Sequence, residues 1–328
     1  MIRRVLLAAA MTGVLVVADS ATAQNLTYAR GQNISPAYEG WEEDSAGRRF
    51  FVFGYMNRNW QEELDVPVGP DNKFMTGTSD QGQPTHFLPR RNRFIFRVPV
   101  PPGFTEKDEL IWSLTTKGKT ELAYASTRID YKIDDVVKAS ETGALGAGSS
   151  SPEVRSNTPP VLEVQGPRRI EVKVGEAVSL TAVVRDDGLP KVRLIGAGAA
   201  VENEGSSATL SAKNPAMLKQ VEALRARRLV LPPARVTVGK NVGLHMGWHV
   251  YRGAGQVKFD TDQIAAWEDT RTGGNSPWAP HWTAPALPAD GRATTKATFL
   301  TPGEYVLRVR ADDGALTTDQ QVVVVVKP

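Results

Sequence analysis

The sequence contains no cysteine in 328 residues. This absence excludes a disulfide framework, a thiol nucleophile, cysteine-held zinc or haem, and a lipid-modified N-terminal cysteine. A chain of this length can be stabilised by hydrophobic cores alone, so it does not need disulfides in order to fold. The formal charge is only +3 and is spread along the chain, which favours neither nucleic acid nor an acidic membrane surface as a partner.

Motifs of the common enzyme classes are also missing from the sequence. It has no GxSxG nucleophile motif, no HExxH zinc motif, no phosphate-binding loop and no dinucleotide fingerprint. No catalytic residue is therefore predicted, and we favour a non-enzymatic protein over an enzyme.

Long apolar runs are absent except at the N-terminus. Two arginines precede an apolar run over 5–18, and small residues occupy 21–23, where a signal peptidase would cut. The run is shorter than the ~20 residues that span a bilayer. We predict a signal peptide over 1–23 and a mature chain that begins at Gln24, has no transmembrane segment, and is periplasmic or secreted in a bacterium.

Alternating apolar and polar residues predict an antiparallel β-sandwich over 24–135. The alternation is clearest at 49–55 and 93–100, where every second residue is aromatic or aliphatic. A Lys-Gly-Lys turn at 117–119 separates two further alternating segments and predicts a hairpin. The following residues, 136–160, contain few large apolar groups, so we interpret them as a flexible linker.

A second sandwich of about seven strands is predicted over 161–328, which makes the whole protein all-β. The alternation breaks at about 189–240, which we interpret as an insertion with one short helix capped by Asn214. Five consecutive valines occupy 322–326. Because an uncovered valine strand would pair with other chains, we expect this strand to be central in its sheet or covered.

Three features of the second domain indicate a family. Trp248 lies on the predicted third strand, Tyr305 follows a Pro-Gly turn at the start of the sixth, and an Ala-Asp-Asp-Gly turn precedes the valine strand. With these features, 160–188 and 242–327 resemble the immunoglobulin-like modules of bacterial surface and secreted proteins, of the PKD and cadherin-like type. The resemblance implies a sandwich with a buried tryptophan and a tyrosine corner. The chain as a whole resembles uncharacterised exported bacterial proteins, which implies nothing about activity.

Two Asp-Asp-Gly sequences follow the predicted second and sixth strands, which end at the same end of the sandwich. Four carboxylates, those of Asp186, Asp187, Asp312 and Asp313, would converge there and offer oxygen ligands to Ca²⁺. The simpler interpretation is turn chemistry, in which Asp bonds its own backbone and Gly takes a positive φ. We favour turn chemistry, and so no cofactor, with calcium as the alternative.

A proline-rich segment over 259–289 carries the predicted ligand-binding residues, Trp267, Trp278, Trp282 and Arg271. Exposed indoles would stack on sugar rings or anchor a partner protein, and the arginine would supply hydrogen bonds. The alternative is that the indoles fold back and cover the open end of the sandwich.

Two histidine-containing segments are candidates for a metal site or an anion site. His245 and His249 alternate with Trp248, so they would share the opposite face of a strand, about 13 Å apart and too far for one metal ion. Residues 86–93 combine a histidine with three arginines. We interpret them as a solvated lead-in to the strand at 93–100, with an anion site as the alternative.

These observations favour an exported, non-enzymatic interaction or structural protein. We expect it to bind a protein or polysaccharide through loops at one end of the second sandwich. The alternative is a carbohydrate-binding or carbohydrate-active protein that uses the tryptophan-rich segment and is stabilised by calcium.

Overall fold

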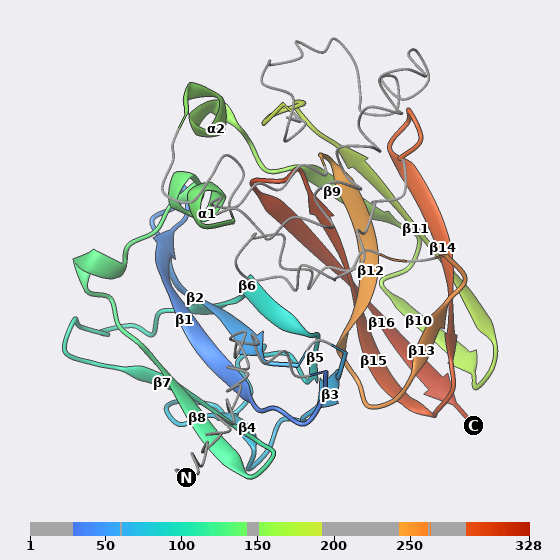
Figure 1. Ribbon diagram of the computed structural model, residues 1–328, viewed down its shortest axis with the longest axis horizontal. Coiled ribbons are helices and arrows are strands. Elements are labelled where there is room, and N and C mark those ends of the chain that lie inside the picture. Colours follow the sequence, from blue (N-terminus) through green and yellow to red (C-terminus); the bar gives the residue numbers. More distant parts are fainter. Residues whose placement is uncertain (1–28, 60, 143–150, 192–242, 262, 264–286) are drawn as a thin grey trace, which may run out of the picture.

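The computed structural model describes residues 29–59, 61–142, 151–191, 243–261, 263 and 287–328 (Figure 1). Within these residues strands predominate, and every strand pair except β10–β16 is antiparallel. The predicted all-β class is therefore confirmed. The predicted signal peptide and the helix near Asn214 lie outside the described residues. No described helix combines the length and apolar character needed to cross a bilayer.

The N-terminal sandwich packs the sheet β1-β2-β6 against the sheet β4-β7-β8, and a short ribbon, β3-β5, lies beside them. Aromatic residues at every second position, such as Phe51, Phe53 and Tyr55, point into the core between the sheets. The strands are β1 (Ile34–Glu43), β2 (Arg49–Asn57), β3 (Leu64–Asp65), β4 (Asn72–Phe74), β5 (His86–Phe87), β6 (Arg90–Pro99), β7 (Leu110–Thr116) and β8 (Lys119–Ala125).

Aromatic rings fill the core of this sandwich. Trp112 is fully buried and lies parallel to two phenylalanine rings and perpendicular to two others. Parallel-displaced and edge-to-face contacts of this kind stabilise beyond the area that they bury. The predicted hairpin is confirmed, because β7 and β8 are joined through Lys117 and Gly118 with φ angles of 52° and 73°.

The described part of 136–160, the segment interpreted as a flexible linker, contains helical structure. After a single 3-10 turn at Ile129–Tyr131, the chain forms helices α1 (Asp135–Thr142) and α2 (Pro152–Ser156). Ser151 caps α2 by accepting a hydrogen bond from the Val154 amide. A small apolar cluster joins these helices to the second sandwich, formed by Ala139, Val154, Ala315 and Leu316.

The C-terminal sandwich packs the sheet β10-β16-β15-β12 against the sheet β13-β14-β11-β9. It is immunoglobulin-like, with Trp248 buried in its core as predicted. The valine strand is central, between β10 and β15, which confirms that expectation. The strands are β9 (Val161–Gln165), β10 (Arg169–Lys173), β11 (Ala177–Arg185), β12 (His245–Arg252), β13 (Val257–Phe259), β14 (Arg292–Phe299), β15 (Gly303–Asp312) and β16 (Thr317–Lys327).

Tyr305 forms the predicted tyrosine corner. Its hydroxyl lies 3.0 Å from the Thr301 carbonyl, 3.2 Å from the Ala254 carbonyl and 2.6 Å from the Thr301 hydroxyl. The turn beneath it requires glycine, because a Cβ at Gly253 or Gly255 would lie 2.5 or 2.8 Å from the Tyr305 side chain and both φ angles are positive.

We expect Tyr305→Phe to lower the free energy of unfolding by about 1–2 kcal/mol, since the ring stays buried and its polar partners lose the hydroxyl. Urea unfolding at pH 7 measures this loss. Tyr124→Phe is the matched control, because Tyr124 is half exposed. Equal losses in the two variants would contradict the tyrosine corner.

Candidate functional site

The outer face of the β12-β15-β16 sheet is covered by the N-terminal sandwich rather than by solvent. Trp248 and Val250 of β12 point into the C-terminal core, so His249 and Tyr251 point the other way. Tyr251 belongs to the aromatic core of the N-terminal sandwich, and β5 lies against β12 (Figure 1). The two sandwiches therefore share a buried contact, which we call the interdomain contact.

Backbone and side-chain hydrogen bonds attach β12 to residues 80–85 of the N-terminal sandwich. The Thr85 amide donates to the Tyr251 carbonyl at 3.2 Å, and the Tyr251 hydroxyl bonds the Gly82 carbonyl. Arg252 donates to the Gln83 carbonyl at 2.8 Å and forms a two-pronged ion pair with Asp80 at 2.7 and 3.0 Å. These bonds occupy part of the free edge of β12.

Two buried arginines share one carboxylate at the centre of the interdomain contact. Arg310 donates two hydrogen bonds of 2.8 Å to Asp319, and Arg308 lies 3.4 Å from the same carboxylate. Arg308 also donates to the Ile95 carbonyl at 2.5 Å and stacks 3.5 Å above the Tyr251 ring. Burial would raise the pKa of Asp319, but the two guanidiniums outweigh it and hold that pKa below its usual value.

His249 lies beside these arginines and is uncharged. Burial and, to a smaller extent, the positive charges of Arg310 and Arg308 together lower its pKa to about 3. The histidine is 8% exposed, so water cannot compensate a charge on its ring.

His86, on the N-terminal side of the contact, has the opposite character. Its Nδ1 lies 2.7 Å from Asp65 and its Nε2 lies 3.0 Å from Glu63, so each ring nitrogen faces a carboxylate. Burial alone would lower the pKa of His86, but the two carboxylates outweigh it and raise the pKa to about 9. The imidazolium thus connects β3 to β5. The interpretation of 86–93 as a solvated lead-in is wrong for its first residues, because 86–88 are buried.

We expect the ion pairs of His86 with Asp65 and Glu63 to make the free energy of unfolding fall at alkaline pH. The folded-state pKa is raised above 6.5, so the stabilisation is complete below pH 6.5 and is lost as the pH rises through about 9. The loss reaches about 3 kcal/mol. Urea unfolding at several pH values from 6 to 10 measures it. His86→Gln should remove this pH dependence, and an unchanged slope in that variant would contradict the assignment.

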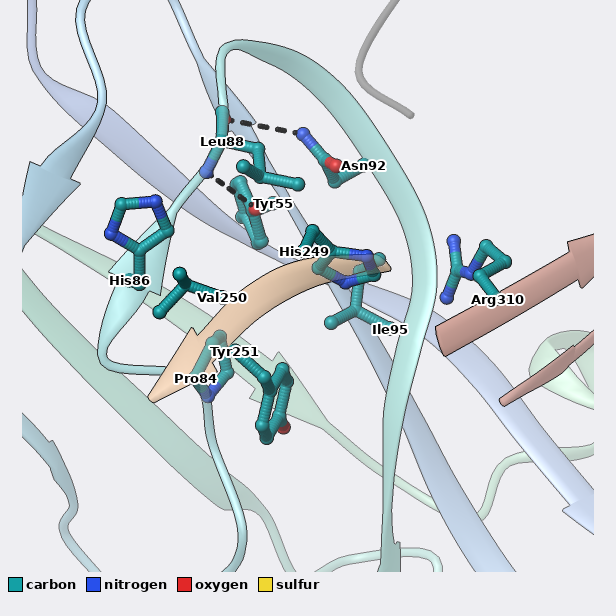
Figure 2. A pocket seen from close by; sticks show the side chains of 10 residues that line it. All are labelled: Tyr55, Pro84, His86, Leu88, Asn92, Ile95, His249, Val250, Tyr251 and Arg310. Carbon is teal, nitrogen blue, oxygen red and sulfur yellow. Dashed lines mark hydrogen bonds between the residues drawn. The ribbon is translucent and has the colours of Figure 1, made fainter. Parts of the chain in front are cut away.

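A small cavity lies between the two sandwiches at this contact (Figure 2). Its volume is ≈ 10 Å³, about the room that one water molecule needs. Tyr55, His86 and Asn92 line it from the N-terminal side, and His249 and Arg310 line it from the C-terminal side. The Tyr55 hydroxyl accepts from the Leu88 amide at 2.9 Å. The cavity is too small for a substrate, so the chemistry of this site is electrostatic and structural.

The two Asp-Asp-Gly sequences do lie at one end of the C-terminal sandwich, and both hold the chain that enters it. Asp187 accepts from the Thr158 amide and hydroxyl at 3.0 and 2.7 Å. Asp313 accepts from the Asn157 side chain at 3.0 Å. Residues 157–158 are thereby fixed to both turns.

Other carboxylate oxygens of these sequences serve the turns themselves, and Oδ1 of Asp186 is buried without a hydrogen-bond partner. Asp186 accepts from the Gly188 amide at 2.9 Å, and Asp312 accepts from the Gly314 amide at 2.7 Å. Among the described residues, no three histidine or acidic side chains are placed to hold a metal ion together. The geometry is that of turn chemistry, and calcium binding stays a prediction.

The predicted ligand-binding residues, Trp267, Trp278, Trp282 and Arg271, lie outside the described residues, and their role stays a prediction. Sequence reasoning missed the interdomain contact. The sequence signal for it is the charge on alternate residues of β15 and β16, where Arg308, Arg310 and Asp319 share one face.

No family model and no curated protein matches the chain. Similar solved structures include domains 4 and 5 of the S-layer protein SbsC (9% identity, 70% of this chain and 69% of that chain, TM-score 0.22). The D00-D0 domain of intimin is also similar (9% identity, 89% of this chain and 100% of that chain, TM-score 0.22). So are the titin domains Z1Z2 in complex with telethonin (9% identity, 89% of this chain and 96% of that chain, TM-score 0.22). The PKD or cadherin-like assignment of the C-terminal sandwich stays a prediction.

Proposed function

We propose that this chain is an exported, non-enzymatic interaction protein that binds a partner protein through the Asp-Asp-Gly end of its C-terminal sandwich. The observation that carries the proposal is the attachment of both Asp-Asp-Gly turns to residues 157–158. A loop end that is already fixed loses little conformational entropy when a partner binds. At this end Arg185, Asp187 and Gly188 are exposed and accessible to a partner, whereas the second turn is buried and serves as their support.

Strand register supports the choice of this end. His245 at the start of β12 pairs with Asp312, and Arg292 at the start of β14 pairs with Val183 near the end of β11. The chain therefore returns to the sandwich from both 192–242 and 264–286 at the same end as the two turns. Loops gathered at one end of a sandwich are the usual place for recognition on this architecture.

Site-specific photo-crosslinking in a bacterium that exports the protein tests the proposal. A photoreactive residue would replace Arg185 or Asp290 at the Asp-Asp-Gly end, and Glu176 or Thr301 at the far end as matched exposed controls. We expect one discrete protein adduct from the first pair and none from the second. Adducts from the far end alone, or equally from both ends, would overturn the proposal.

A further inference from the structure

The interdomain contact holds more basic groups than acids. Arg308, Arg310 and His249 lie together on the outer face of the β12-β15-β16 sheet, and Asp319 is the carboxylate that bonds the two guanidiniums. While His249 is neutral, Arg310 is paired with Asp319 and the Arg308 guanidinium is stacked on Tyr251. A proton on His249 would place three cations around one carboxylate in a site that water hardly reaches.

The described groups around His249 offer no second carboxylate as a direct partner. Strand β15 contributes Arg308, Arg310 and, two residues further along, Asp312. The carboxylate of Asp312 accepts a hydrogen bond from the Gly314 amide. From β16 come Asp319 and Gln321. The N-terminal sandwich supplies Tyr55, Asn92 and His86, and the acids near His86, namely Glu63 and Asp65, are bonded to its ring. Tyr251 on β12 lies beneath Arg308.

Separating the sandwiches would relieve a charge on His249 and leave the C-terminal core intact, and the N-terminal core would lose only its edge contact with Tyr251. The histidine points away from Trp248 and Val250, which pack inside the C-terminal sandwich. Once the N-terminal sandwich moves off, the ring lies on an open sheet face and can be solvated. The two domains are joined only through residues 126–160 in sequence, so they can part while staying connected.

We propose that the interdomain contact is a proton-operated latch, in which protonation of His249 separates the two sandwiches in acid while each remains folded. Acidification below pH 6.5 should lower the closed-to-open ratio by about tenfold per pH unit, down to about pH 3. The separation would expose Tyr251 and the arginine face, a surface that is covered at neutral pH.

Distance measurements on the full mature chain test the latch. Because the chain has no cysteine, cysteines introduced at Ser45 and Glu176, both exposed turn positions, can carry a pair of fluorescent dyes. We expect energy transfer to change between pH 6.5 and 3, reversibly, while near-ultraviolet circular dichroism keeps the signal of the packed tryptophans.

His249→Gln provides the decisive variant, because glutamine cannot take up the proton. Its energy transfer should stay constant over the pH range in which the wild type opens. His245→Gln is the matched control on the same strand, and it should open like the wild type. If His249→Gln is not folded at pH 7, His249→Asn replaces it in the same measurement.

Two results would overturn the latch. One is an acid profile of the glutamine variant that matches the wild type. The other is a wild-type change in energy transfer that coincides with loss of the circular dichroism signal, since the histidine would then act only in whole-protein acid unfolding.

Discussion

Replacing Asp319 with alanine should destabilise the protein by about 3 kcal/mol, measured as the free energy of unfolding in urea at pH 7. The carboxylate itself is 23% exposed, but the guanidiniums that it bonds, those of Arg310 and Arg308, are only 11% and 6% exposed. Removing it leaves two buried cations without their shared partner, which costs far more than the loss of a surface pair.

A matched set of variants separates this effect from simple loss of a salt bridge. Glu304→Ala removes the partner of Arg169, an exposed pair on the same sheet, and should leave stability nearly unchanged. Replacing Arg308, Arg310 and Asp319 together with methionine, methionine and leucine should recover much of the lost stability. A triple variant as unstable as Asp319→Ala would show that shape, and not charge, holds the contact.

Replacing Trp112 with alanine should cost about 4 kcal/mol of unfolding free energy and unfold the N-terminal sandwich first. The indole is fully buried against four phenylalanine rings. Its nitrogen donates to Asn72 at 3.0 Å, and Asn72 in turn bonds two backbone carbonyls. The substitution thus leaves a large cavity and a buried amide oxygen without its donor.

Urea unfolding, followed together with hydrogen exchange of β4 and β7, measures this prediction. Trp112→Phe keeps most of the volume and should cost roughly half as much, mainly through the lost hydrogen bond. Leu122→Ala on the outer face of β8 is the control, because that side chain is 39% exposed, and it should change stability by no more than ~0.5 kcal/mol. Similar losses in all three variants would contradict the central role of Trp112.

Strands with a strict two-residue period were predictable from the sequence, and irregular ones were not. The patterns at 49–55 and 93–100 both correspond to strands, because a two-residue period fits an extended chain with one face in the core. β1 was missed, since Pro36 and Gly40 interrupt its pattern and Gly40 lies where the register shifts. β9 was missed because it is short and follows two prolines.

The candidate site was only partly predictable for a related reason. The periodicity correctly placed His249 opposite Trp248, but it could not show whether that face meets water or another domain. A face of arginine, histidine and aspartate has the composition of a solvated surface, and only its pairing between the neighbouring strands β15 and β16 makes burial possible. Likewise, small residues such as Ala139 made 136–160 resemble a linker, although Ala139 and Val154 have a complementary site against Leu316.

The position of β16 has a consequence for how the protein matures. It lies between β10, with which it pairs in parallel, and β15, so the sheet has a gap until residues 317–327 are in place. The partners of β16 are separated from it by up to about 150 residues of chain, and such distant contacts form slowly. During synthesis on the ribosome, the second sandwich therefore cannot close early. It can complete its fold only after residues 317–327 have emerged, so its earlier strands wait with one sheet unfinished.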